Sequence, residues 1–413
     1  MKTKIPPLFI LCASIYALQS LGGLPGLSLF LYLKEHLGLS EVQIMNIGFY
    51  ISLCWIIKPM FAPLIDNLFT HKIWIILSLM GSIVASILFS ISPFLTIPIV
   101  IAIGSFGSLC GMFRDISIDA TSCISGKEND NNHTLQSIQW GSLFIASVFV
   151  GLAGGWLADH VNYKLAYLYT IPFYLAVIYI VSKIKSDKKI NICSECRWEG
   201  ECIDEMKDAS PAHTSGCYSP KTLWKTLKSY GIIFKDKHFI LIGIFLFLYT
   251  FSPSFGTPLS FRMRDLFHWT GLQMGVLDAV CSISAIIGMI LFAKFIHLIP
   301  VKKVLYVSIL VGASLTLGYL WFTPTTAFIL GALGGVIGSI INLVLLTWAA
   351  KISIKNKEAT SFALLCGILN GSSSASLWAG KTLLPIVGFN WLVVIAAFTS
   401  FLCLPLLRFI DEK

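Results

Sequence analysis

Apolar segments of about 20 residues recur along the whole chain, and they constrain its fold more than any other feature. Each segment is long enough to cross a hydrocarbon core of about 30 Å as one α-helix. None alternates apolar and polar residues as the strands of a membrane barrel do. Of 413 residues, 56% are hydrophobic and 12% are charged, whereas soluble domains carry about 25% charged residues. The sequence therefore predicts an integral, all-α membrane protein.

The apolar segments form two sets of six on either side of one long polar stretch. The predicted spans cover 7-32, 42-66, 72-92, 95-121, 134-158, 163-184, 238-260, 270-293, 301-322, 326-350, 359-382 and 386-408. We therefore expect twelve transmembrane helices in an N-terminal six-helix half (1-184), a cytoplasmic linker (185-237) and a C-terminal six-helix half (238-413).

The N-terminal segment has the basic start and apolar run of a signal peptide. Its apolar run continues to Phe30, which is longer than the 7 to 15 residues of a signal-peptide core. We expect an uncleaved first span.

Lys and Arg concentrate in the loops that share a side of the membrane with both termini. The positive-inside rule therefore predicts that both termini are cytoplasmic, in the cell (inner) membrane. These loops also account for the net charge of +9, so we expect lipid rather than nucleic acid as the surrounding partner. We expect a monomer that holds no cofactor.

The predicted linker contains "CSECRWEGEC", followed by His213 and Cys217. A Cys-x2-Cys pair with later Cys and His residues can bind zinc. The later spacings match no zinc module, and no second Cys-x2-Cys pair occurs. We expect a reduced, partly disordered linker and no metal site.

Ionisable side chains inside predicted spans are functional candidates, because they cost several kcal/mol unless they face a partner or a polar cavity. Lys58 lies eight residues before Asp66, about 12 Å along a helix that rises 1.5 Å per residue. Asp115 lies at a similar depth in the fourth span. We predict that Lys58 and Asp115 pair or face one cavity; the alternative is that each reaches the headgroups independently.

The heptapeptide "RDISIDA" places Asp119 one helical turn beyond Asp115, on the same face. Neighbouring carboxylates favour the binding of a proton by one of them, which is the basis for a proton-coupling hypothesis. Alternatively, Asp119 ends the buried stretch as a gate residue and pairs with Arg114 or Lys127.

The seventh span reads "FLYTFSPSFGTPLSF", in which Pro253 and Pro258 each remove a helix donor. Broken helices line cavities in transporters, although a simple kink remains open. Arg262 and Arg264 follow this span, and Asp278 lies inside the eighth. These three residues can form an outer ion pair, as a gate or as a structural contact.

Several segments, in this order along both halves, resemble the folate-biopterin transporter family, a branch of the major facilitator superfamily. They are "IYALQSLGGLPGLSLFLYLKEHLGLS", "WIIKPMFAPLID", "RDISIDA", "LQSIQWGS", "FSPSFGTPLSF" and "EATSFALLCGILNGSSS". The resemblance implies two six-helix halves that rock around a central cavity. The residues carried over are Gln19, Lys58, Pro59, Asp66, Asp115, Asp119, Gln136, Trp140, Gly141, Asn370 and Gly371.

Two departures from the superfamily pattern surround Asp66. The basic signature after it is reduced to "NLFTHK", and Ala62 stands where glycine is expected. The sequence therefore does not assign Asp66 to the usual cytoplasmic gate of the superfamily.

The resemblance implies a secondary active transporter of folates or pterins, and the neighbouring carboxylates add the expectation that H⁺ is a coupled ion. A carboxylate such as Asp115 can hold the N-H donors of a pterin, an aromatic ring such as Trp140 can stack on it, and Lys58 can bind folate carboxylates. A transporter of another metabolite, such as S-adenosylmethionine, is the alternative. An enzyme of the prenyltransferase kind would need a second Asp-rich cluster, which does not occur; a non-transporting receptor is the remaining class.

Overall fold

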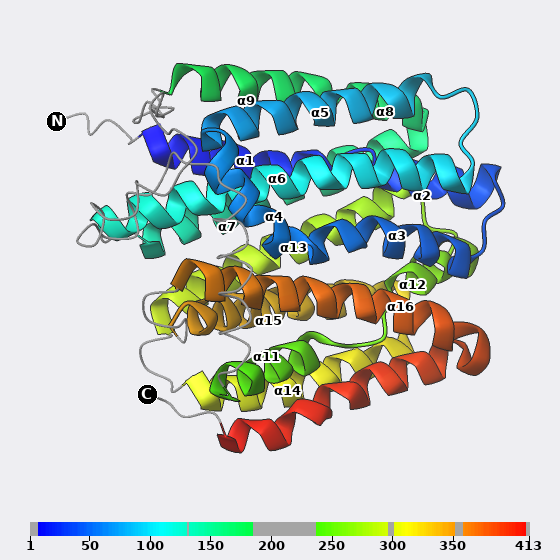
Figure 1. Ribbon diagram of the computed structural model, residues 1–413. Coiled ribbons are helices and arrows are strands. Elements are labelled where there is room, and N and C mark those ends of the chain that lie inside the picture. The colour runs from blue at the N-terminus through cyan, green and yellow to red at the C-terminus, as the bar shows by residue number, and fades with distance from the viewer. Residues whose placement is uncertain (1–6, 130–131, 185–236, 296–300, 352–357, 410–413) are drawn as a thin grey trace, which may run out of the picture.

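The computed structural model describes residues 7–129, 132–184, 237–295, 301–351 and 358–409. All regular secondary structure within these ranges is helical. The helices run side by side along one common direction, and α1 begins at the same end of the bundle at which the last helical segment, η6, ends (Figure 1). The predicted linker and its zinc alternative lie outside the described residues.

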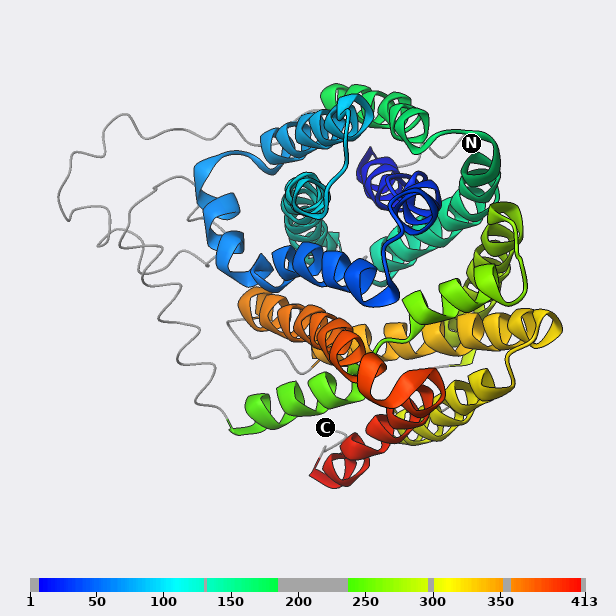
Figure 2. The same ribbon diagram turned by 90° about the vertical axis from the view of Figure 1, so that its right-hand side faces the viewer.

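Two groups of helices lie on opposite sides of the molecule when it is viewed along the bundle (Figure 2). The first group contains α1 (Pro7–Leu21), α2 (Gly26–Leu31), the π-helical η1 (Tyr32–His36), α3 (Glu41–Ile56), α4 (Lys58–Leu68), α5 (His71–Ile91), α6 (Ile97–Asn129), α7 (Asn132–His160), α8 (Tyr163–Leu168) and α9 (Ile171–Lys183). The second contains α11 (Lys237–Thr250), α12 (Gly256–Asp265), α13 (Gly271–Phe295), α14 (Val301–Gly318), the 3-10 helix η5 (Tyr319–Trp321), α15 (Pro324–Lys351), α16 (Glu358–Thr399) and the 3-10 helix η6 (Ser400–Phe409).

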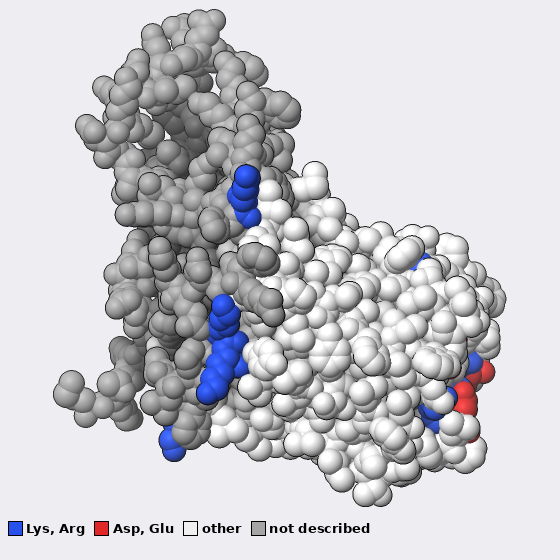
Figure 3. All heavy atoms as spheres, turned by 90° about the horizontal axis from the view of Figure 1, so that it is seen from below, with Lys and Arg blue, Asp and Glu red and all other residues white. Residues whose placement is uncertain are grey.

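Nine helical segments in the described part of the chain are long and apolar enough to cross a membrane. Two shorter apolar helices are Glu41–Ile56 and Phe239–Thr250. The longest candidate, Leu364–Leu407, contains Gly388 at φ 73°, where the helix is interrupted. A broad uncharged belt covers the face in Figure 3, with basic side chains near one edge and a mixed charged group at the other end. The number of twelve spans stays a prediction.

Helix boundaries follow local chemistry, with one difference from expectation. Ser40 and Gln43 form a capping box that starts α3, in which the Ser40 N-H donates to Gln43 Oε1 at 2.9 Å. The difference concerns α6, which continues to Asn129, past the predicted end of the fourth span at residue 121. The polar residues after 121 therefore extend the helix instead of ending it.

The predicted break in the seventh span is present. α11 ends at Thr250 and α12 begins at Gly256, with no helical residue between them. The backbone N-H groups of Ser252 and Ser254 donate to the hydroxyl and the carbonyl of Ser376, at 3.0 and 2.9 Å. The freed donors are thus satisfied by α16, as buried backbone groups require, and Pro253 is buried within this break.

Helices α7 and α13 join the two groups through facing glycines. A Cβ atom on Gly275 would lie 2.0 Å from the carbonyl oxygen of Gly151, and one on Gly155 would lie 2.7 Å from that of Gly271. Only glycine permits so close a backbone approach, as in other small-residue contacts between membrane helices.

Replacing Gly275 by alanine is expected to destabilise the protein, because the new methyl group would overlap backbone atoms that cannot rotate away. The matched control is Gly312→Ala, at a helical position where a Cβ would meet nothing within 4 Å. The thermal unfolding midpoint in detergent should fall for Gly275→Ala and hold or rise for Gly312→Ala. Equal midpoints for the two variants would show that the α7 and α13 contact is not close-packed.

Candidate functional site

A cavity of about 340 Å³ lies between the two groups of helices. Its walls come from α1, α3, α4, α6 and α7 on one side and from α11, α15 and α16 on the other. The lining residues are Tyr16, Gln19, Trp55, Lys58, Asp115, Asp119, Ser122, Leu135, Gln136, Gln139, Trp140, Leu143, Thr250, Asn342, Leu345, Cys366, Leu369, Asn370 and Ser373. Both groups of helices therefore contribute polar side chains to one chamber.

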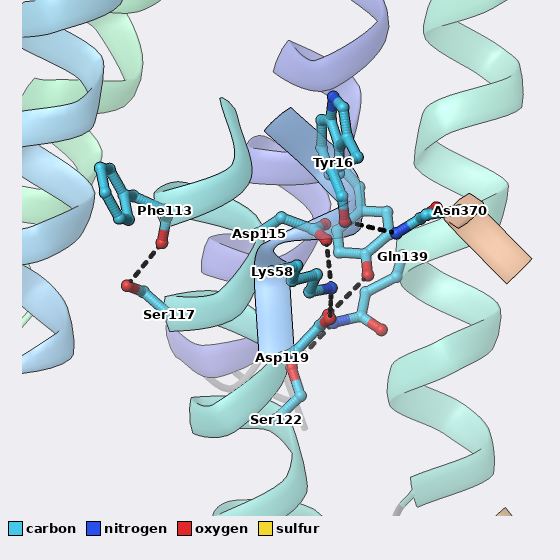
Figure 4. Close-up of polar contacts among 10 residues, drawn as sticks. Tyr16, Lys58, Phe113, Asp115, Ser117, Asp119, Ser122, Gln139 and Asn370 are labelled. Atoms are coloured by element: carbon cyan, nitrogen blue, oxygen red, sulfur yellow. Dashed lines mark hydrogen bonds and ion pairs between the residues drawn. The ribbon is translucent and has the colours of Figure 1, made fainter. Parts of the chain in front are cut away.

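Lys58 bridges two carboxylates in the wall of this cavity. Its Nζ lies 2.5 Å from Asp115 Oδ2 and 2.9 Å from Asp119 Oδ2 (Figure 4). The side chains of Lys58, Asp115 and Asp119 are 9%, 12% and 28% exposed. We call these three residues the charge cluster. The predicted contact between Lys58 and Asp115 is present, and Asp119 shares the same ammonium.

Local sequence explains how the charge cluster forms. Lys58 begins α4, directly after the interruption at Ile57 that separates α4 from α3, and Pro59 occupies the first turn of α4. The Pro59 ring packs closely on α16, since a Cβ on Gly367 would lie 2.6 Å from Pro59 Cγ. Asp115 and Asp119 face Lys58 together because residues four apart share one face of a helix.

Tyr16 and Gln139 complete the polar wall, and the sequence did not single them out. The Tyr16 hydroxyl donates to Asp119 Oδ1 at 2.9 Å, and its ring meets Trp140 edge-on with centroids 6.2 Å apart. Gln139 Nε2 donates to Ser122 Oγ at 2.8 Å. Sequence spacing offered a signal, because Tyr16 lies three residues before Gln19, and Gln139 lies three residues after Gln136. Such pairs share a helical face.

The pairing of Asp119 with Arg114, one of the alternatives from the sequence, is not formed. Arg114 is buried and donates to Ser82 Oγ on α5 at 3.4 Å. Adjacent helical residues point about 100° apart, so Asp115 faces the cavity while Arg114 faces the neighbouring helix. The side chain of Lys127, the other expected partner, lies outside the described residues.

Some of the other predicted site residues line the cavity, and some lie away from it. Gln19, Gln136, Trp140 and Asn370 line the cavity, together with Asn342. The Asn370 amide donates to the Trp55 carbonyl oxygen at 3.5 Å, which links α16 to α3.

Three predicted residues stand apart from the cavity lining. Gly141 faces α13, where a Cβ would lie 3.3 Å from Met289 Cε, whereas a Cβ on Gly371 would meet nothing within 4 Å. Asp66 belongs to α4, but its side chain is outside the described part.

The outer ion pair expected for Asp278 is not formed. Among the residues that the structure describes, Arg264 Nε donates to Glu35 Oε1 at 2.5 Å, and the Arg262 guanidinium lies 3.9 Å from the ring centroid of Phe389. Asp278 is exposed on α13, and within the described residues no ion pair joins it to either arginine. Arg262 and Arg264 lie in the last turn of α12, whereas Asp278 lies two turns inside α13, so their depths differ.

A reciprocal pair of ion pairs instead joins the two groups of helices at the end opposite the start of α1. Lys34 pairs with Asp265, and the adjacent Glu35 pairs with Arg264. Nearby, Lys381 Nζ donates to Asn46 Oδ1 at 2.5 Å. We call the four residues of the two ion pairs the outer ladder, because the sequence predicts that this end faces the outside. It connects η1 to α12 and so ties the two groups together at this end.

Comparisons with known proteins agree with this architecture. The model of the Major Facilitator Superfamily matches residues 131–342. A protein of Synechocystis sp. named folate-biopterin transporter is 23% identical over 430 aligned residues, which cover 95% of this chain and 80% of the relative.

Solved structures show the same fold. The nucleoside transporter NupG aligns with a TM-score of 0.71 and 13% identity, over 98% of this chain and 100% of its own. A D-xylose-proton symporter aligns with a TM-score of 0.73 and 10% identity, over 98% of each chain. These relatives are transporters rather than enzymes, as the sequence predicts. The chain belongs to the Major Facilitator Superfamily and is an integral, multi-pass membrane protein of the transporter type.

Proposed function

We propose that this chain carries a folate or pterin compound across the cell membrane by alternating access, with H⁺ as the coupled ion. The observation that carries this proposal is the charge cluster, which places two carboxylates and one ammonium in a cavity between two groups of helices. Charged groups at membrane depth are typical of substrate and proton pathways. The relative named folate-biopterin transporter supports the choice of substrate.

The chemistry of the cavity suits a pterin. The flat aminopyrimidinone ring presents paired N-H donors, which the Asp119 carboxylate can accept, and Gln136 and Asn370 offer amides that can both donate and accept. Trp55 and Trp140 provide apolar faces on which a ring can stack. The volume of about 340 Å³ lies at the lower end of small-molecule pockets, roughly 300 to 1,000 Å³.

Transport through this cavity requires the two groups of helices to move relative to each other. We propose that residues 1-184 and 238-413 are the two moving halves, joined by a cytoplasmic linker, with both termini in the cytoplasm. The cavity lies between these halves, and the outer ladder joins them at the far end. This is the arrangement expected of a carrier closed at its outer side.

A second candidate substrate is a cationic metabolite such as S-adenosylmethionine. The observation that favours it is the excess of negative over positive charge in the charge cluster, in which one lysine faces two aspartates. A substrate cation can supply the missing positive charge.

Counterflow in proteoliposomes tests the proposed function without any imposed gradient. Vesicles loaded with unlabelled compound would receive labelled biopterin, folate or S-adenosylmethionine outside. We expect labelled biopterin to enter faster than in protein-free vesicles. Entry of S-adenosylmethionine alone would replace the proposed substrate with the second candidate, and entry of none of the three would contradict both.

Reversing one charge of the outer ladder is expected to open the outer side more often. Lys34→Glu places two acidic residues opposite each other, and like charges at this distance repel. A cysteine introduced at Ser373, in the cavity wall, should then react faster with a membrane-impermeant thiol reagent added to the outside of intact cells. The cysteine-free background, with Ser373→Cys alone, gives the reference rate.

The matched control restores the pairing with the signs exchanged. Lys34→Glu combined with Asp265→Lys should return the labelling rate toward the reference. Equal rates for the reference, the single reversal and the exchanged pair would exclude the outer ladder as an outer closure.

A further inference from the structure

Only three charged side chains occur among the described residues that line the cavity, and they do not cancel. Lys58 supplies one positive charge, and Asp115 and Asp119 supply one negative charge each. When both aspartates are ionised, the charge cluster therefore presents one net negative charge to whatever enters the cavity.

The lysine of the charge cluster is the group least able to meet a substrate. Its side chain is only 9% exposed, and its ammonium already contacts both carboxylates at 2.5 and 2.9 Å. A substrate carboxylate would have to displace one aspartate to reach Lys58, which would leave that aspartate buried without its counterion. Such a loss is strongly unfavourable in a site of low dielectric constant.

The carboxylate of Asp119 is the charged group that a substrate meets first. It is 28% exposed, against 12% for Asp115. Its Oδ1 accepts a hydrogen bond from Tyr16, which holds the carboxylate toward the cavity. A group with N-H donors can approach this carboxylate, whereas an anion is repelled by it.

The remaining polar groups of the wall do not supply a second cation. Gln19, Gln136, Asn342 and Asn370 are uncharged amides. Arg114 is adjacent to Asp115 in sequence, but its guanidinium is directed to Ser82 on α5. Within the described wall, a carboxylate substrate thus finds no cation that is free to bind it.

We propose that the cavity selects substrates whose bound end is neutral or cationic and rich in N-H donors, and that it rejects carboxylates. If the proposed function is correct, the cargo is an unconjugated pterin and not folate, whose glutamate end carries two carboxylates. This changes the role expected from the sequence for Lys58. The lysine is an internal counterion that positions Asp115 and Asp119, and it does not bind the carboxylates of a substrate.

Competition in the counterflow assay tests the selectivity, together with ligand-induced shifts of the thermal unfolding midpoint of the purified protein. The probes are biopterin, pterin-6-carboxylate, folate and S-adenosylmethionine. Pterin-6-carboxylate keeps the pterin ring and adds one carboxylate. We expect it to need at least a tenfold higher concentration than biopterin for half-maximal inhibition.

Removing the exposed negative charge should weaken the discrimination. In Asp119→Asn, the ratio between pterin-6-carboxylate and biopterin is expected to fall at least threefold. Glu41→Gln is the matched control, because it removes one negative charge at the first residue of α3 and outside the cavity lining. The ratio in this control should equal that of the unmodified protein.

The possible results separate the inference from the proposed function. Equal competition by biopterin and pterin-6-carboxylate, or preference for folate, would overturn the charge rule while leaving a folate or pterin carrier in place. Binding of S-adenosylmethionine alone would overturn the pterin proposal and, because this cation also carries a carboxylate, the rejection of carboxylates as well. Binding of none of the four probes would overturn both. The comparison of biopterin with pterin-6-carboxylate in the unmodified protein tests the charge rule even if Asp119→Asn fails to fold.

Discussion

Replacing Lys58 by alanine is expected to abolish transport of every substrate and to lower the free energy of unfolding by about 3–5 kcal/mol, because it leaves the largely buried Asp115 and the partly exposed Asp119 without their counterion. Lys58 is 9% exposed and contacts both Asp115 and Asp119, and among the described residues that line the cavity no other cation is present to replace it. The thermal unfolding midpoint in detergent and the rate of counterflow are the two measurements.

The matched variant separates the fold from the activity. Lys58→Ala combined with Asp115→Asn removes one charge of each sign and so restores the net charge of the cluster. We expect this double variant to recover most of the lost stability but no transport. A Lys58→Ala protein with the unfolding midpoint and the uptake of the unmodified protein would contradict a role for Lys58 as counterion.

Replacing Asp115 by asparagine is expected to eliminate accumulation against a gradient while exchange of substrate across the membrane continues. Asparagine keeps the size of the side chain and its contact with Lys58, but it cannot bind and release a proton. An imposed inward proton gradient should therefore leave the inside and outside concentrations of substrate equal. Labelled substrate in proteoliposomes measures both processes.

Ser117→Ala is the control for this variant. Ser117 lies on α6 between the two aspartates, but its hydroxyl donates to the Phe113 carbonyl oxygen at 2.8 Å and points away from the charge cluster (Figure 4). Its removal should preserve accumulation. If Asp115→Asn still concentrates substrate as Ser117→Ala does, Asp115 does not carry the coupled proton.

The sequence predicted the features that depend on composition and on single helices. Apolar length indicated membrane helices, paired prolines indicated the break between Thr250 and Gly256, and equal depth indicated the contact of Lys58 with Asp115. Each of these follows from the spacing of residues along one chain segment and from the cost of burying charge.

Features that depend on how helices rotate against one another were not predictable in this way. A pairing of Asp119 with Arg114 or Lys127 was one alternative from the sequence, but the packing of α6 directs the arginine to α5 and the aspartate to Lys58. Tyr16 reaches Asp119 from α1, more than a hundred residues away in sequence. The outer ladder likewise pairs residues of η1 and α12, whose contact no local pattern indicates.

We propose that an inward proton gradient drives the accumulation of a pterin through this cavity. The most direct test is the accumulation of labelled biopterin in proteoliposomes under an inward proton gradient. We predict an internal concentration above the external one, which collapses when a protonophore is added. Entry no faster than into protein-free vesicles, with or without the gradient, would contradict the account.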